Sequence, residues 1–295
     1  MNGFLNLLKP PGMSSGAAVA VVKRLTGERV GHAGTLDPEA AGVLPIMVGR
    51  ATRLLDCFPD KSKSYAAEIS FAGATDTQDA QGTVTEKAVR VPERAEIEAV
   101  LPVFRGIILQ RPPAYSALKK NGVPLYQLAR KGQAVETEAR ETEIRELTLG
   151  EKTGEDGYML YVDCGSGTYI RTLCHDIGQA LGAPAHMRFL LRTRHGAFDI
   201  ARATTVEEVE QAAADGALES LLLPLDFPLA ALPRLDLPEA YWKMGRNGAK
   251  LPAALLPELE EDRRCRIYAA DALLGVGRRE QNVIRYDVGL TGGEA

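Results

Sequence analysis

The segment 31–48 constrains the fold more than any other part of the chain, because turn-forming residues lead directly into an apolar run. Pro38 disfavours the helical conformation for the residue before it, so Asp37 is predicted to lie on a turn. Three glycines can adopt a positive φ or allow close approach to the backbone: Gly31, Gly34 and Gly42. The run 43–48 is typical of a buried strand. The pattern predicts a carboxylate at the edge of a buried strand; the alternative is that Asp37 only caps a short helix that begins at Pro38.

Length and composition restrict the class of protein. A chain of 295 residues, of which 45% are hydrophobic, is expected to form one large domain or a large domain with a small one. The first eight residues lack a basic leader and run into a Pro-Pro-Gly turn, so neither a signal peptide nor a membrane span is expected there. The four cysteines are scattered without a C-x-x-C pair, which argues against a zinc site or a disulfide framework and favours a cytoplasmic location.

Charge is distributed unevenly along the chain. The net charge is −4, which argues against a strongly basic coat for nucleic acid. The segment 105–135, however, contains six basic residues and no acidic one. It also contains two tyrosines, Tyr115 and Tyr126, so it could offer both phosphate contacts and stacking surfaces to RNA. The alternative is a solvated surface loop with a chance excess of positive charge.

Periodicity and turn residues predict the remaining elements. Alternating or apolar runs predict strands over 5–8, 61–71, 141–149 and 158–164. Helices are predicted over 17–25, with Ser14 or Ser15 as the cap and Gly27 as the end, and over 92–101. The acids of the segment 75–82 lack the spacing of a calcium loop, so a turn between strands is expected. A Leu- and Pro-rich connector, 221–238, precedes a region of short strands and turns.

Residues 32–45, H-A-G-T-L-D-P-x-A-x-G-V-L-P, resemble the active-site motif of the TruB family of tRNA pseudouridine synthases, which modify uridine 55 in the TΨC arm. The resemblance is dense over the whole motif and implies that Asp37 is the catalytic nucleophile. The pattern K-P-x-G-x-x-S at residues 9–15 resembles the opening motif of the same family and precedes the Asp37 motif at the family's spacing.

Three later motifs resemble the family in the same order, the last of them at residues 185–192, which resemble the family's A-H-x-x-x-L-R-R. K-x-Y at 63–65 implies that Tyr65 packs against the target base, and G-T-Y-I-R-x-L at 167–173 implies that Arg171 pairs with Asp37. The resemblance further implies that Tyr169 lines the base pocket, that Leu190 closes it, and that His32 aids base flipping. Two positions depart from the family pattern, Val123 and Leu191, where the family usually has Lys and Arg, so a contact to RNA or to the fold is in doubt at each.

The resemblance also implies the architecture and the reaction. The expected fold is α+β: a catalytic domain over 1–228 with a mixed, largely antiparallel sheet, flanking helices and an RNA-binding insertion at about 105–135. A small β-barrel-like domain of the PUA type is expected over 229–295. Three basic residues of the insertion are expected to grip the T-arm stem-loop of tRNA: Lys119, Lys120 and Arg130. Isomerisation of uridine needs no metal and no cofactor, and the protein is expected to be a monomer without an obligate partner.

Two other classes of function compete with this interpretation. A non-catalytic RNA-binding protein would gain nothing from a carboxylate in a phosphate-rich cleft, so the pairing of Asp37 with Arg171 argues against it. A carboxylate-based glycoside or nucleoside hydrolase would need a second nearby acid as proton donor, and no paired acid accompanies Asp37 in the sequence. Whether Asp37 attacks C1′ of the ribose or C6 of the uracil is open.

Overall fold

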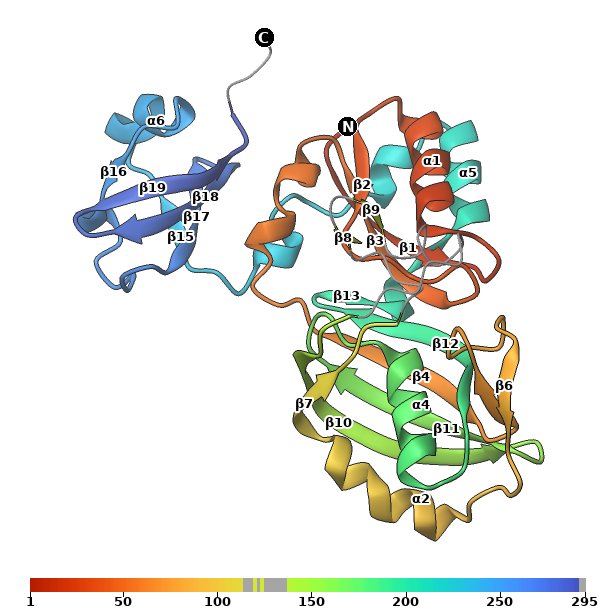
Figure 1. Ribbon diagram of the computed structural model, residues 1–295. Helices are drawn as coiled ribbons and strands as arrows, with labels where there is room; N and C mark the ends of the chain where they lie inside the picture. The colour runs from red at the N-terminus through yellow and green to blue at the C-terminus, as the bar shows by residue number, and fades with distance from the viewer. Residues whose placement is uncertain (114–118, 121–122, 125–136, 292–295) are drawn as a thin grey trace.

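The computed structural model describes residues 1–113, 119–120, 123–124 and 137–291. It confirms the α+β class, since one large mixed sheet carries helices and a smaller, curled sheet follows towards the C-terminus (Figure 1). In the large sheet the strands run in the order β14-β1-β3-β12-β4-β11-β10-β7, and β2 and β13 pair with β3 and β12 at its margin. Its ten strands are β1 (Gly3–Lys9), β2 (Val30–His32), β3 (Ala41–Val48), β4 (Lys63–Ser70), β7 (Gly106–Gln110), β10 (Arg140–Thr153), β11 (Gly157–Cys164), β12 (His186–His195), β13 (Phe198–Asp199) and β14 (Thr204–Thr205).

Two pairs of helices cover this sheet. Helices α1 (Ser15–Thr26) and α5 (Val206–Ala214) lie against each other over the β1 end, and α2 (Arg94–Val100) and α4 (Ile170–Ala180) lie over the β10–β11 half (Figure 1). The prediction for α1 is confirmed: the Ser14 side chain accepts a hydrogen bond from the Ala17 amide, and Gly27 ends the helix in the left-handed conformation. The predicted turn at 75–82 is also confirmed, because it connects β5 (Gly73–Thr75) to β6 (Val84–Lys87).

The two halves of the large sheet meet where β12 lies between β3 and β4. Strand β12 pairs in parallel with β3 over two residues and antiparallel with β4 along its whole length. Gly42 makes the parallel contact possible, because its φ of +116° and the closeness of the Arg192 backbone leave no room for a Cβ atom. The loop that carries Asp37 leads directly into β3, so this junction places it beside β12 and β4.

The beginning of the basic segment 105–135 belongs to the large sheet. Strand β7 pairs with β10 along Gly106–Gln110 and forms the sheet's edge. Beyond it, the structure describes the two-residue strands β8 (Lys119–Lys120) and β9 (Val123–Pro124), which pair antiparallel. The part of the basic segment beyond β7 therefore follows directly on an edge strand of the large sheet.

The C-terminal unit is a five-stranded sheet with its own core. Its strands run in the order β15 (Arg234–Asp236), β17 (Arg264–Ala269), β18 (Ala272–Glu280), β19 (Val283–Gly289) and β16 (Leu251–Pro252). Helix α6 (Glu239–Arg246) packs on it, although only turns and short strands are predicted from this part of the sequence. Val276 and Leu290 belong to one apolar cluster with Phe4 and Phe58, so the unit packs directly against the N-terminal strand region.

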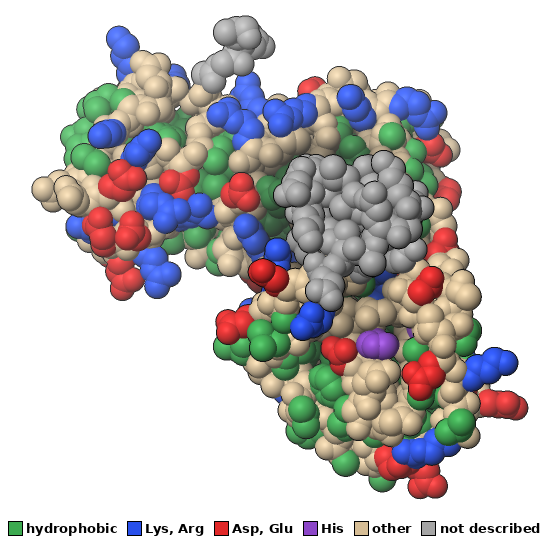
Figure 2. All heavy atoms as spheres, viewed as in Figure 1, with side chains coloured by type: hydrophobic (Ala, Val, Ile, Leu, Met, Phe, Trp, Pro, Cys, Tyr) green, Lys and Arg blue, Asp and Glu red, His purple; other side chains and the backbone are tan. Residues whose placement is uncertain are grey.

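Side-chain charges are not spread evenly over the surface. Figure 2 shows Lys and Arg side chains along the upper edge of the face in view, where acidic side chains are sparse. In the described part of the chain, none of the helices has the length and apolar character needed to cross a bilayer.

Candidate active site

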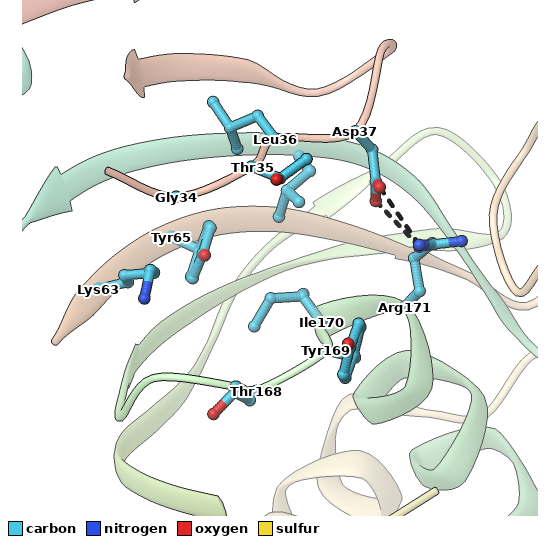
Figure 3. A pocket seen from close by; sticks show the side chains of 12 residues that line it. Gly34, Thr35, Leu36, Asp37, Lys63, Tyr65, Thr168, Tyr169, Ile170 and Arg171 are labelled. Carbon is cyan, nitrogen blue, oxygen red and sulfur yellow. Dashed lines mark hydrogen bonds and ion pairs between the residues drawn. The ribbon is translucent and has the colours of Figure 1, made fainter. Parts of the chain in front are cut away.

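A cavity of about 330 Å³ opens where the Asp37 loop, β4, β12 and the start of α4 converge (Figure 3). The loop contributes residues 34–37, and β12 contributes Leu190. Strand β4 contributes Lys63 and Tyr65. The turn before α4 and the first residues of that helix contribute residues 167–171. Of the residues singled out from the sequence, the cavity thus brings together Asp37, Arg171, Tyr65, Tyr169 and Leu190.

Asp37 and Arg171 form a two-pronged ion pair at one end of this cavity (Figure 3). The Arg171 Nε atom lies 3.0 Å from Asp37 Oδ2, and Nη2 donates to Asp37 Oδ1 at 3.2 Å. A guanidinium fork that meets both oxygens fixes the orientation of the carboxylate as well as its charge. The Arg171 side chain is only 6% exposed, whereas that of Asp37 is 37% exposed, so the acid faces the cavity and its partner lies beneath it.

A second carboxylate holds Arg171 from the other side. Arg171 Nη1 donates to the Thr77 carbonyl at 3.2 Å and lies 3.4 Å from Asp79 Oδ2. Both partners lie in the turn between β5 and β6, for which the sequence predicts only a connection between two strands. Asp79 is thus a site residue that sequence reasoning missed; its only signal there is a D-T-x-D-x-x-G pattern in a turn.

Burial raises the pKa of Asp37, and Arg171 opposes this shift as the nearest positive charge. Asp79 raises the pKa of Asp37 further. The alternative in which Asp37 only caps a helix is wrong, because residues 38–39 form a turn in which the Ala40 amide donates to the Asp37 carbonyl. The Asp37 side chain is instead turned toward Arg171 (Figure 3).

Apolar and aromatic side chains form the walls of the cavity. Tyr65 and Leu190 are 8% and 7% exposed, and both lie in the central core of the large sheet. Tyr169 directly precedes α4, where the Gln110 side chain clamps its backbone: Oε1 accepts from the Tyr169 amide at 3.0 Å and Nε2 donates to its carbonyl at 3.3 Å. Gln110 is the last residue of β7, so the edge of the sheet fixes one wall of the cavity.

His32 is not among the residues that line the cavity. It ends β2, five residues before Asp37, and its buried Nδ1 atom has no hydrogen-bond partner among the described residues. Burial, reinforced by Arg192, lowers the pKa of His32, which favours the neutral ring.

Two side chains of the opening motif, residues 9–15, form hydrogen bonds with the backbone of the Asp37 loop. The buried Lys9 ammonium donates to the carbonyls of Pro10, Met13 and Pro38, the last at 3.0 Å. The Ser15 hydroxyl bonds both the amide and the carbonyl of Leu36, each at 2.9 Å. The spacing K-P-x-G-x-x-S therefore places two side chains against the backbone on either side of Asp37.

Lys63 lines the cavity near Tyr65. Burial, assisted by the nearby Arg192, lowers the pKa of Lys63 to about 8. Its ammonium donates to the Lys61 carbonyl at 3.2 Å. The K-x-Y motif includes this lysine, but sequence reasoning gave a role only to the tyrosine.

The three basic residues expected to grip RNA are not described at the level of side chains. Arg130 lies outside the described residues, and for Lys119 and Lys120 only the backbone of β8 is described. Within the described ranges, no three His, Cys, Asp or Glu side chains gather in a way that could hold a metal ion.

Family models and named relatives match most of this chain. Residues 23–170 match the model described as TruB family pseudouridylate synthase (N terminal domain), and residues 171–230 match tRNA pseudouridylate synthase B C-terminal domain. The chain is 44% identical over 265 residues to a tRNA pseudouridine synthase B of Geobacillus thermodenitrificans, which covers 86% of this chain and 88% of the relative. It is 46% identical over 253 residues to the enzyme of the same name from Ectopseudomonas mendocina, covering 83% and 82%.

A solved structure shares the architecture. A chain of the crystal structure of a Cbf5-Nop10-Gar1 complex superposes with a TM-score of 0.75 at 26% identity, over 98% of this chain and 85% of that chain. The region after residue 230, which contains the five-stranded sheet, lies outside both matched family models but inside this superposition.

Proposed function

Because the chain belongs to the TruB family of pseudouridylate synthases, we propose that it isomerises uridine 55 in the T-loop of tRNA to pseudouridine, with Asp37 as the nucleophile. The observation that carries this proposal is the ion pair between Asp37 and Arg171 at the mouth of a cavity with apolar and aromatic walls. Arg171 favours the ionised form of this carboxylate and orients it, and the acid faces the cavity, as a covalent catalyst requires.

The reaction is balanced without any added group. The N1–C1′ bond breaks, the uracil turns, a C5–C1′ bond forms, the C5 proton is lost and N1 gains a proton. Asp37 adds to either C1′ or C6 and is released at the end, so the carboxylate is regenerated. None of these steps consumes an oxidant, a reductant or a group donor, and we propose that the enzyme acts without a cofactor.

The cavity walls suggest how the base is held. A uridine inside a folded loop must leave its stack before its glycosidic bond can be reached. Tyr65 would pack against the flipped uracil, with Tyr169 and Leu190 as further walls of the pocket. Arg171 would keep Asp37 ionised while the base displaces water. His32, which lies outside the cavity, would support the flipped nucleotide from the preceding strand.

We propose that the T-arm is gripped by the basic segment that follows β7, through Lys119, Lys120 and Arg130. In this proposal residues 1–228 form the catalytic domain, and residues 229–295 form an RNA-binding unit of the PUA type that enlarges the contact with tRNA. The protein would act as a cytoplasmic monomer without an obligate partner.

The proposal is tested with an unmodified tRNA transcript and the purified full chain. Pseudouridine mapped at position 55 under single-turnover conditions, with and without EDTA, is the expected result. A transcript with cytidine at position 55 serves as the matched control and should bind without giving product. Tight binding of the uridine transcript without any pseudouridine would instead identify a non-catalytic RNA-binding protein.

A further inference from the structure

Arg192 lies in β12 directly beneath the Asp37 loop. Its side chain is fully buried, with 0% exposure. In the described part of the chain no carboxylate forms an ion pair with it; it donates to backbone carbonyls instead. Nε reaches the Val43 carbonyl at 2.7 Å, Nη2 the Gly34 carbonyl at 3.0 Å and Nη1 the Thr35 carbonyl at 3.3 Å.

These three carbonyls lie on both sides of Asp37. Gly34 and Thr35 precede the carboxylate and Val43 follows it in β3, so one rigid guanidinium spans the base of the loop. The backbone of Arg192 also pairs with Gly42, which fixes the same loop from the strand side. A fork of five N–H donors can bond carbonyls that point in several directions, whereas a lysine ammonium acts as a single point.

The same residue also lies beside Tyr65. Arg192 and Tyr65 stand directly opposite each other where β12 pairs antiparallel with β4. Arg192 therefore connects the nucleophile's loop to the ring proposed to pack against the base. Burial raises the pKa of Tyr65 to about 12, although the positive charge of Arg192 acts to lower it, so the phenol stays neutral at physiological pH.

A direct contact between Arg192 and RNA phosphate does not fit this geometry. A fully buried side chain with its N–H groups committed to carbonyls cannot reach a phosphate without breaking the loop that carries Asp37. The neighbouring Leu191, where the family usually has a second arginine, leaves Arg192 as the basic residue of this pair.

We propose that Arg192 is a positioning residue that sets the distance between the Asp37 carboxylate and the Tyr65 ring. The proposal rests on the proposed function, because it assigns to these two residues their roles toward the uridine. It predicts that loss of the guanidinium slows the chemical step and leaves tRNA affinity unchanged. A misplacement of about 1 Å at a reacting group costs on the order of 100-fold in rate.

The experiment compares Arg192→Met, Arg192→Lys and the matched control Arg188→Met in the full chain. Arg188 lies on the same strand and binds Glu68 and Asp156, away from the cavity. Single-turnover pseudouridine formation at saturating enzyme, tRNA Kd and amide hydrogen exchange over residues 34–43 are measured on the same preparations. Arg192→Met is expected to lose about 100-fold in rate, with unchanged Kd and faster exchange in the loop, and Arg192→Lys should recover only part of the rate.

Each outcome decides the proposal. A folded Arg192→Met variant with the wild-type rate, or one that loses affinity and no rate, overturns it, as does an equal loss in Arg188→Met. If Arg192→Met does not fold, Arg192→Lys decides, because a wild-type rate there would show that the fork is not needed. If the wild-type chain makes no pseudouridine, the proposed function fails. Faster amide exchange confined to residues 34–43 in Arg192→Met would then still show that Arg192 holds the Asp37 loop, and unchanged exchange would overturn the proposal.

Discussion

Asp37 and Arg171 lie 134 positions apart in the sequence, yet Arg171 meets the two carboxylate oxygens of Asp37 at 3.0 and 3.2 Å. The pair is asymmetric, because the arginine is buried and the aspartate faces a cavity. An ion pair that only stabilises the fold does not require an exposed carboxylate, whereas a nucleophile must be accessible to its substrate.

Asp37→Asn is expected to abolish pseudouridine formation at any enzyme concentration and to leave tRNA binding intact. The amide keeps the shape and can still accept a hydrogen bond from Arg171, but it has lost the nucleophilic charge. Asp37→Ala should be inactive and less stable, because a buried charge that loses its partner typically costs about 3–5 kcal/mol. Asp79, 3.4 Å from Arg171, offsets part of this cost. Thermal unfolding, tRNA affinity and single-turnover yield test this, and product from a folded Asp37→Asn protein would refute the mechanism.

Two substitutions around Arg171 should move the acid limb of the pH–rate profile in opposite directions. Activity requires ionised Asp37, so the rate falls as the pH drops through its pKa. Arg171 lowers that pKa and Asp79 raises it. Arg171→Met is therefore expected to shift the acid limb to higher pH, and Asp79→Asn to shift it to lower pH.

The measurement is the single-turnover rate against pH at saturating enzyme, and the position of the limb is compared, not its height. Glu98→Gln, in the exposed ion pair with Arg94 on α2, serves as the control and should leave the limb in place. Limbs that shift together, or not at all, would mean that a group other than Asp37 controls the rate.

Much of the local structure could be predicted from the sequence, because its signals lie within a few residues of one another. The Ser14 cap and the end of α1 at Gly27 both depend on near neighbours. Helix α6 lacked such a signal, since Pro238 precedes it and offers no side-chain cap.

The site was predicted only where a motif marked it. The family resemblance indicated Asp37 and Arg171, and the structure places them in contact. Asp79, Arg192 and Gln110 were missed, because their roles depend on partners far away in the chain: Arg192 bonds Val43 across 149 positions and Gln110 bonds Tyr169 across 59. No periodicity or spacing encodes such contacts; the sheet order that brings β12 between β3 and β4 creates them.

Gly42→Ala should destabilise the fold by more than backbone strain alone would. Gly12 and Gly42 both have positive φ, and an alanine at Gly12 would meet nothing within 4 Å, whereas one at Gly42 would collide with the Arg192 backbone. Gly12→Ala is therefore expected to cost about 1 kcal/mol, and Gly42→Ala clearly more, with loss of activity as the β3–β12 pairing opens. Chemical denaturation of both variants measures the difference, and equal costs would show that β12 can move aside.

Replacement of Lys119, Lys120 and Arg130 by Ala should weaken tRNA binding and flatten its dependence on salt. Each phosphate contact contributes roughly 0.7–0.9 to the slope of log K against log salt concentration. Loss of three contacts should therefore reduce the steepness by about 2 to 3. The single-turnover rate at saturating enzyme should stay close to wild type, because none of the three is proposed to touch the reacting atoms.

The control for this prediction removes the same charge elsewhere. Lys87, Arg94 and Lys152 are exposed and lie outside both the cavity lining and the basic segment. Their replacement by Ala should leave the salt slope nearly unchanged, because these three residues are not proposed to contact RNA. The net charge of the protein changes by the same amount in both triple variants, so the comparison isolates the position of the charges. Equal slopes in the two triple variants would mean that the segment after β7 acts only through net charge and does not grip the T-arm.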